Sequence, residues 1–323
     1  MKVLLAILIA ATTCWAQTAP PARRPVPRPP SAGGQATSPE SDPSATIRVQ
    51  VRLVNVFATV TDSHGAPVGG LTKDDFKVFE DGVQQQVSVF DRESELPLSI
   101  VMGIDASLST RKDLPLELES ARRFVHAILR PVDAMSVYKF DETVTELQSF
   151  TGKASLIDHA IDRVRSGSAT ALYDAIYLAS ESLVRRQGRK VMIMITDGGD
   201  TASRTDYQEA LRSAQISEAI IYSIIMVPIE ASAGRDTGGE HALIQISADT
   251  GGKHYYATSL AQLDHAFKQI SDELRTQYLV AYYPPKVAHD DFRRITIELA
   301  KTAPDGTPYN VHNRTGYYTS KMK

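Results

Sequence analysis

The chain has 323 residues, of which 42% are hydrophobic and 23% are charged, and its formal net charge is −3. This composition is typical of a globular protein, and the length allows two domains. Because there is no basic excess, we expect no nucleic-acid partner. The single cysteine and the single tryptophan both lie within the first 16 residues, so we expect no disulfide and no cysteine-based metal site in the remaining chain.

Residues 1–16 have the pattern of a secretory signal peptide. Lys2 supplies the positive charge, Val3–Ala11 is the apolar run, and Cys14-Trp15-Ala16 forms a small-x-small cleavage site. The apolar run is too short to span a membrane. We therefore expect a secreted or periplasmic protein with no integral membrane segment after cleavage. A lipid-modified Cys14 is the alternative, although the preceding Ala-Thr-Thr is a poor lipidation motif.

Residues 17–45 form a predicted linker. This stretch is rich in proline and glycine and has almost no large apolar side chains, so it cannot bury a core. From Thr46 the pattern changes to the alternation typical of a half-buried strand, from Ile47 to Leu53. The parity of the alternation then flips at Val54, which predicts a bulge or a strand that passes between two sheets.

Short β elements continue to Glu95 and return after Gln277. Thr72–Asp75 resembles a capping box on one helical turn, and Asp81-Gly82 is a hairpin signal. A single small sheet is rarely stable alone. We therefore expect residues 46–95 and 277–319 to form one β-sandwich-like domain, into which residues 96–276 are inserted.

Residues 96–276 alternate apolar strands with amphipathic helices. Strands are predicted at 98–105, 135–140, 190–196, 219–227 and 253–256, with an edge strand at 144–150. Helices are predicted near 113–130, 155–164, 170–186, 240–250 and 260–275. Near-continuous hydrophobicity marks strands that are buried on both faces. The segment therefore predicts an α/β fold, a doubly wound and mostly parallel sheet with helices on both faces.

Oxygen-bearing side chains follow two of the buried strands and open one helix. Asp105, Ser107 and Ser109 follow the first strand, Thr170 opens a helix, and Asp197 follows the strand at 190–196. Ligands bind at the carboxyl ends of parallel strands, and hard divalent cations prefer oxygen ligands. These residues therefore predict a site for Mg²⁺, and the same donors would admit Mn²⁺ or Ca²⁺.

The three stretches that carry these residues, in this order, resemble the metal-ion-dependent adhesion site of von Willebrand factor type A domains. The resemblance implies that Ser107, Ser109 and Thr170 ligate the metal directly. Asp105 and Asp197 would act directly or through water. It also implies that a carboxylate of a protein partner completes the coordination shell. Because neutral hydroxyls outnumber acids in this set, an external acidic residue is favoured.

The flanking segments carry a second resemblance. Gly70–Gly82 and Arg314–Tyr318 look like the flanks of secreted bacterial proteins of the acidobacterial type that are related to the same family. Together the two resemblances cover nearly the whole chain after the linker. They imply a non-enzymatic, extracytoplasmic module that binds a protein ligand.

Two other functions compete with this one. The first is a structural subunit of an envelope assembly, in which the metal site is vestigial. The second is a metal-dependent hydrolase or phosphotransferase with Asp105 as the nucleophile. Such a phosphatase would want an acid at position 107, where Ser107 stands, and no Gly-x-Ser-x-Gly elbow accompanies a histidine and an acid. A Gly-x-Gly-x-x-Gly fingerprint for a dinucleotide is also missing after the first strand.

Three other features give weaker signals. Asp200 lies either near the metal shell or in a plain turn, and the turn is the simpler interpretation. Asp174 is most simply a partner of the helix dipole. Gly234–Gly239 forms either a rim loop of the site or an ordinary solvated loop.

Overall fold

The computed structural model describes residues 53–92, 95–227, 237–285 and 292–319. The predicted signal peptide, the predicted linker, most of the strand expected from Ile47 to Leu53 and residues 234–236 of the expected loop lie outside the described residues. The rest of that loop, residues 237–239, is not a loop but the start of a helix. Residues Gln50–Lys323 form one compact unit. Among the described helices, none is long and apolar enough to cross a membrane.

The central sheet has six strands and confirms the predicted α/β architecture. In spatial order they are β10 (His254–Ala257), β9 (Ile220–Met226), β8 (Arg189–Thr196), β5 (Leu98–Asp105), β6 (Ala134–Phe140) and β7 (Val144–Thr151). All neighbouring pairs are parallel except β6 and β7. The edge position predicted for residues 144–150 is therefore confirmed, because β7 closes one side of the sheet.

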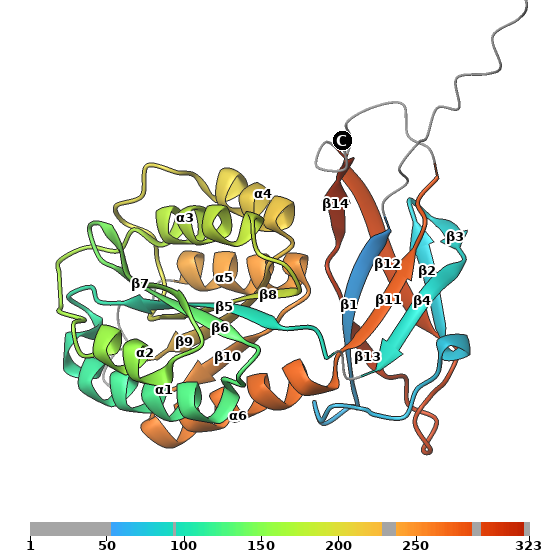
Figure 1. Cartoon of the computed structure of the whole chain (residues 1–323), viewed down its shortest axis with the longest axis horizontal. Helices are drawn as coiled ribbons and strands as arrows, with labels where there is room; N and C mark the ends of the chain where they lie inside the picture. The colour runs from blue at the N-terminus through green and yellow to red at the C-terminus, as the bar shows by residue number, and fades with distance from the viewer. Residues whose placement is uncertain (1–52, 93–94, 228–236, 286–291, 320–323) are drawn as a thin grey trace, which may run out of the picture. The chain divides into compact units, whose positions relative to one another are not determined.

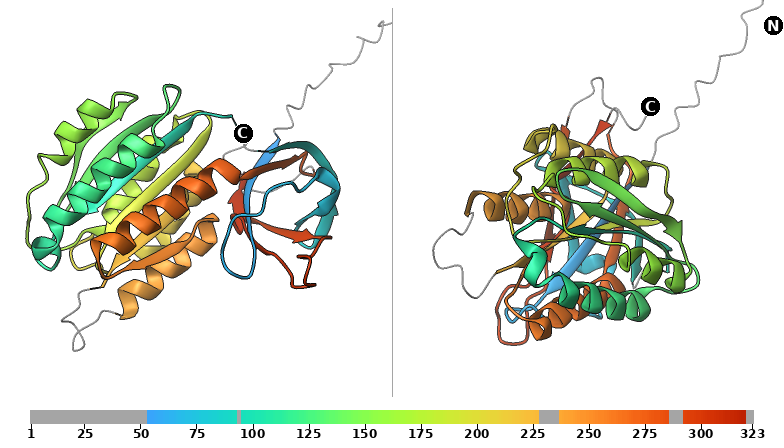
Figure 2. Two further views of the ribbon diagram at one scale, coloured as in Figure 1. Left: turned by 90° about the horizontal axis from the view of Figure 1, so that it is seen from below. Right: turned by 90° about the vertical axis from the view of Figure 1, so that its left-hand side faces the viewer.

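Six helices cover the two faces of the central sheet. They are α1 (Leu114–Ile128), α2 (Ala154–Ile161), α3 (Leu172–Val184), α4 (Tyr207–Ser217), α5 (Thr237–Thr250) and α6 (Leu260–Thr276). Helices α1, α2 and α6 share one buried cluster with the sheet, and α3, α4 and α5 share another (Figure 1). Figure 2 shows α1 and α6 side by side on their face, where the Phe124 and Phe267 rings stack at 4.6 Å.

Strands β5 and β8 lie in the middle of this sheet, and both are buried along their whole length. Successive side chains of a strand point to opposite faces. In β5, Ile100 and Met102 accordingly join the cluster under α1, whereas Val101 joins the cluster under α3. The near-continuous apolar sequence of both strands follows from this two-sided burial.

Among the α-helices of the described residues, α4 is the one that the sequence patterns did not predict. Asp206 caps its first turn by accepting the Glu209 backbone N–H at 2.8 Å. Its buried face consists of small and polar side chains, among them Ala210, Ser213 and Ala214. Because its fully buried positions carry no large apolar residue, and only the partly buried Tyr207 and Leu211 pack against the cluster, the hydrophobic period of a helix is weak in the sequence.

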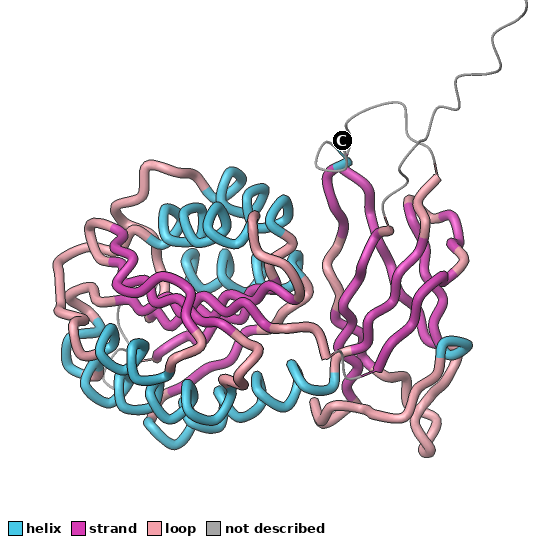
Figure 3. Tube along the Cα trace, viewed as in Figure 1, coloured by secondary structure: helices cyan, strands magenta, loops and turns pink. Residues whose placement is uncertain are grey.

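Two antiparallel sheets flank the central one. The first has the order β13-β1-β11-β4 and the second has the order β14-β12-β2-β3. The strands of the first are β13 (Asn310–His312), β1 (Val54–Thr61), β11 (Tyr278–Tyr282) and β4 (Val87–Arg92). Those of the second are β14 (Gly316–Tyr318), β12 (Phe292–Leu299), β2 (Phe76–Glu80) and β3 (Val83–Gln85). Figure 3 distinguishes these strands from the helices by colour.

The flanking sheets share one apolar core, to which β1, β2, β4, β11, β12 and β14 all contribute. Segments from both sides of the α/β part pair directly, since Val56 of β1 lies opposite Val280 of β11. The predicted local turns are present as well. Asp75 accepts the Thr72 backbone N–H at 2.7 Å, and Asp81 and Gly82 both have positive φ in the β2–β3 hairpin. The two flanks therefore pair as the sequence predicts.

The division into an inserted domain at 96–276 and a domain formed by 46–95 plus 277–319 stays a prediction. Every buried residue of the two clusters that cover the central sheet lies between Leu98 and Leu274. We therefore expect the 96–276 fragment to fold alone and to melt in one cooperative transition. It would lose contacts such as the hydrogen bond from Thr315 N–H to Asp249 O, each worth about 1 kcal/mol. A fragment that melts without cooperativity would contradict the division.

Candidate metal centre

The Asp105 carboxylate ends β5 and is fully buried. The Ser107 backbone N–H donates to its Oδ1 at 2.8 Å, and the Thr196 hydroxyl donates to its Oδ2 at 2.7 Å. Thr196 is the last residue of β8, and the parallel register places it beside Asp105, because Ile104 pairs with Ile195. Both carboxylate oxygens are thus held in a fixed orientation at the carboxyl edge of the sheet.

Two serine hydroxyls lie directly beyond this carboxylate. The Oγ atoms of Ser107 and Ser109 are 3.0 Å apart. The turn that carries them is held by the Thr110 hydroxyl, which donates to the carbonyl oxygens of Asp105 at 3.2 Å and Ser107 at 3.1 Å. Ser107 is buried and Ser109 is exposed, so the hydroxyl pair leads from the protein interior to solvent.

Backbone hydrogen bonds tie the loop of Thr170 to both neighbouring loops. On one side, Gly167 N–H donates to Ala106 O at 2.6 Å. On the other, Thr170 N–H donates to the Thr201 hydroxyl oxygen at 2.9 Å, and Thr201 N–H donates to Thr170 O at 2.8 Å. Thr170 itself is buried and lies just before α3. The three loops that carry the predicted ligands therefore meet at one edge of the sheet.

Asp197 directly follows β8 and is half-buried. The chain turns sharply after it, since Gly198 has a φ of +143°, a value that favours glycine. Helix α5 packs closely on this turn, and a Cβ atom at Gly239 would lie only 2.3 Å from the Gly199 Cα. The position of Asp197 is thus set by close backbone packing on the loop that follows it.

The electrostatics of the site favour a cation. The pKa of Asp105 is raised to about 6, because burial and the nearby charge of Asp197 together outweigh the hydrogen bonds from Thr196 and Ser107, which lower it. The buried Asp105 carboxylate thus lies near that of the half-buried Asp197, and a divalent cation would relieve their repulsion.

The donor set also fits a hard cation. Octahedral ligands at about 2.1 Å from Mg²⁺ lie about 3.0 Å from one another, which matches the distance between the Ser107 and Ser109 hydroxyl oxygens. In the described part of the chain, no group of three or more His, Cys, Asp or Glu residues is arranged to hold a metal. The hydroxyl oxygens must therefore complete any coordination shell at this edge.

The two neighbouring acids, Asp200 and Asp174, have structural partners. Asp200 accepts the Tyr173 N–H at 3.2 Å and the Ser203 N–H at 3.3 Å, so it joins its own turn to the first turn of α3. Asp174 accepts the Thr205 N–H at 2.9 Å, and its hydrogen bonds lower its pKa against the effect of burial. These contacts favour the plain-turn interpretation of Asp200.

Sequence reasoning missed Glu117, which lies on α1. Its side chain is only 1% exposed, and neither carboxylate oxygen has a hydrogen-bond partner. Its pKa is raised to about 8, chiefly by burial and in addition by the charges of Asp105, Asp113 and Asp197. The helical period that places Leu114 and Ala121 on the buried face also includes position 117, so the sequence contained a signal for a buried acid.

The fold and the edge cluster together define a class of proteins in which an α/β sheet presents an oxygen-rich site at its carboxyl edge. Residues 99–270, more than half of the chain, match the family model of the von Willebrand factor type A domain. The protein belongs to the von Willebrand factor type A family. No curated protein sequence matches the chain.

Several solved structures are similar to this chain. A von Willebrand factor type A protein from Catenulispora acidiphila is 12% identical, with a TM-score of 0.50 over 75% of this chain and 74% of that one. The PilB minor pilin of Streptococcus sanguinis is 13% identical, with a TM-score of 0.45 over 56% of this chain and 63% of the pilin. The von Willebrand factor domain of a type V pilus tip protein from Porphyromonas gingivalis is 14% identical, with a TM-score of 0.43 over 55% and 94%.

Proposed function

We propose that this protein is a non-enzymatic, extracytoplasmic module that binds a protein ligand through a divalent cation, Mg²⁺ or a similar ion. Ser107, Ser109 and Thr170 would hold the ion directly, and Asp105 and Asp197 would hold it directly or through water. The observation that carries the proposal is the pair of serine hydroxyls, 3.0 Å apart, beside a buried carboxylate. When bound, the cation would supply an electropositive position for an acidic side chain of the partner.

The ligand count supports an external ligand. Mg²⁺ takes six oxygen ligands, and this chain offers five side chains, so at least one position stays open to water or to a partner. Where the two aspartates act through water, the direct protein ligands are neutral hydroxyls. Both arrangements favour an anionic group from outside.

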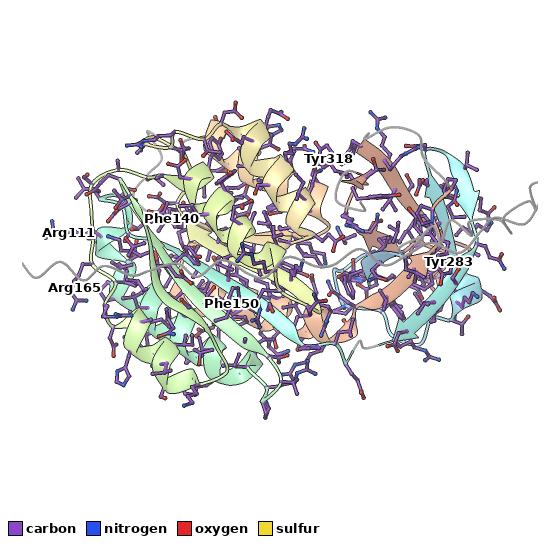
Figure 4. The ribbon with its side chains drawn as sticks, turned by 45° about the horizontal axis from the view of Figure 1, so that its top comes forward. Arg111, Phe140, Phe150, Arg165, Tyr283 and Tyr318 are labelled. Atoms are coloured by element: carbon purple, nitrogen blue, oxygen red, sulfur yellow. The ribbon has the colours of Figure 1, made fainter. Side chains whose placement is uncertain are left out.

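The surface beside the site supports a partner with a carboxylate and an apolar neighbour. Leu108 lies between the two serines and is 59% exposed. Arg111 and Arg165 are exposed on the loops that follow Ser109 and precede Thr170, and both project from the same end of the central sheet (Figure 4). An apolar side chain and two cations around an oxygen-rich site suit an acidic protein segment.

The extracytoplasmic location in this proposal rests on the signal-peptide pattern of residues 1–16. The non-enzymatic role rests on the family and on the residues at the site. Ser107 occupies the position where a phosphatase of the kind considered above would carry its second acid.

Capture of partner proteins tests the proposal. We expect the protein to capture a partner from envelope extract or culture supernatant in Mg²⁺ and to lose it in EDTA. Thr170→Ala should weaken capture at least tenfold, because it removes one ligand and no backbone contact. Thr201→Ala is the matched control: it removes the hydroxyl that accepts the Thr170 N–H but leaves all five ligands in place. Its cost should be about 1 kcal/mol of stability, with capture retained.

A partner whose capture survives both EDTA and Thr170→Ala would place binding away from the metal centre. The flanking sheets would then be the first surfaces to search.

A further inference from the structure

A cavity of about 610 Å³ lies at the amino ends of the central strands, far from the metal centre. Gly188 and Lys190 at the start of β8 line one wall, together with Ile220 at the start of β9. Asn55 and Phe57 of β1 line the opposite wall. This volume is in the range of pockets that hold small molecules.

Arg314 is the polar residue of this cavity with the most unsatisfied donors. Its side chain is about nine-tenths buried, and Nη2 donates to Asn55 O at 2.7 Å. Nε and Nη1 are buried without a hydrogen-bond partner, and the Glu218 carboxylate lies 3.6 Å from Nη1, beyond hydrogen-bond range. The guanidinium is thus ion-paired with Glu218 and lies over the Tyr317 ring, but its Nε and Nη1 atoms have no hydrogen-bond partner beside the cavity that Arg314 itself lines.

The lining of the cavity carries a net positive charge. Lys190 and Arg314 contribute two positive charges, and Glu218 contributes one negative charge. The guanidinium of Arg186 is engaged elsewhere, because it donates to the Ser99 hydroxyl at 2.9 Å and lies over the Phe150 ring. Apolar and aromatic surface surrounds them, including Phe57 and Ile220. An anionic group on an apolar body would complement both features. The proline-rich linker of this chain is a poor occupant, because it carries arginines and no compensating cluster of acids.

We propose that this cavity binds a small organic molecule that carries a carboxylate or phosphate group, with Arg314 as its anchor. The guanidinium fork matches both groups, because two parallel N–H donors meet two oxygens of one anion. Lys190 would add a second cation from the opposite wall, and Phe57 would contact the apolar body. The site is separate from the metal centre, since Lys190 is the second residue of β8 and Asp197 follows the end of this strand.

Titration calorimetry with two probes, citrate and inorganic phosphate, tests the proposal on the full chain after the linker. Metal ions are removed beforehand with a chelating resin, because dissolved EDTA is itself a polycarboxylate and would compete for the cavity. Neither probe can then bind through a cation at the metal centre. We expect wild type to bind at least one probe at millimolar or lower concentration, and the stronger probe identifies the preferred group. Arg314→Gln should weaken binding roughly tenfold or more, as expected for the loss of charge-assisted hydrogen bonds.

Two further variants keep the test valid if Arg314→Gln folds poorly. Glu218→Gln removes the acid nearest to Arg314 and should tighten binding several-fold, whereas Lys190→Gln should weaken it. Arg123→Gln on α1 is the matched charge control, since Arg123 pairs with Asp264 and does not line the cavity. The proposal is overturned if wild type binds neither probe at 10 mM, or if Glu218→Gln and Lys190→Gln bind as wild type does.

Discussion

Asp105→Asn is expected to abolish binding of divalent cations while leaving the fold of the metal-free protein intact. The carboxylate is buried at the end of β5, and its raised pKa shows that its charge is unfavourable there without a cation. Asparagine keeps an oxygen to accept the Ser107 N–H, and its amide can donate to the Thr196 hydroxyl oxygen. Affinity for Mg²⁺ or Mn²⁺ should fall at least a hundredfold by calorimetry. The melting temperature in EDTA should stay the same or rise.

Asp200→Asn is the matched control for this substitution. It also neutralises one acid near the edge cluster, but its side chain serves the turn before α3 and accepts from Tyr173 and Ser203. We expect cation binding to be retained and stability to fall by about 1 kcal/mol. Asp105→Asn should therefore lose cation binding without losing stability, whereas Asp200→Asn should lose stability without losing cation binding. Equal cation affinity in wild type and Asp105→Asn would contradict cation binding at this metal centre.

Glu117→Gln is expected to make the metal-free protein markedly more stable at pH 8. In the folded chain the pKa of Glu117 is about 8, whereas an unfolded glutamate has its ordinary value of 4.5. Between these values the folded state binds more protons than the unfolded state, so stability is highest at low pH and falls as the pH rises. Above pH 8 the loss is complete, because Glu117 is then ionised in both states.

The pH window that isolates Glu117 runs from about 6.5 to 8. The ionisation of Asp105 makes stability depend on pH only below about pH 6, which is its raised pKa. Burial lowers the pKa of His312 to about 4, so the ionisation of this histidine affects stability only below its ordinary pKa of 6.5. Across the window wild type should lose roughly 2 kcal/mol, at 1.36 kcal/mol per proton and pH unit. Urea denaturation in EDTA at several pH values measures this slope.

Glu117→Gln should flatten that slope, because glutamine has the same shape and no ionisation. Glu119→Gln is the control on the same helix. Glu119 is exposed and pairs with Arg123, so its removal should leave the slope unchanged. A slope that persists in Glu117→Gln would show that another group carries the pH dependence.

The hydrophobic runs of the sequence were sufficient to predict the central sheet. The apolar runs of β5 and β8 identify them as strands that are buried on both faces of a parallel sheet. The residues that follow these two strands must therefore lie at the carboxyl edge of that sheet. The side chains that orient Asp105 were harder to find. Thr196 becomes its partner only through the parallel register of β5 and β8, and register is a long-range property that no local pattern encodes.

Prediction from the sequence failed where the hydrophobic pattern was weak or where a residue did not suit its position. Helix α4 buries alanine and serine, so the difference in hydrophobicity between its buried and exposed positions is small. Glu117 lies at an apolar position of α1, where an acid is rarely buried without a partner. In the flanking segments the alternation predicted strands, but the pairing of Val56 with Val280 joins residues more than 200 positions apart. The instability of a single small sheet predicted that the two flanks pair, and only the structure supplied their alignment.

Strand β8 carries opposite charges at its two ends, with Lys190 near its start and Asp197 directly after it. Seven residues of extended chain separate them by roughly 23 Å, at about 3.3 Å per residue. At an effective dielectric constant of 20, two unit charges at that separation interact by about 0.7 kcal/mol, and a Debye length of about 8 Å reduces this further. Through electrostatics alone, a unit charge bound at one end therefore changes affinity at the other less than about threefold. A larger coupling in a two-ligand titration would report mechanical movement of the sheet.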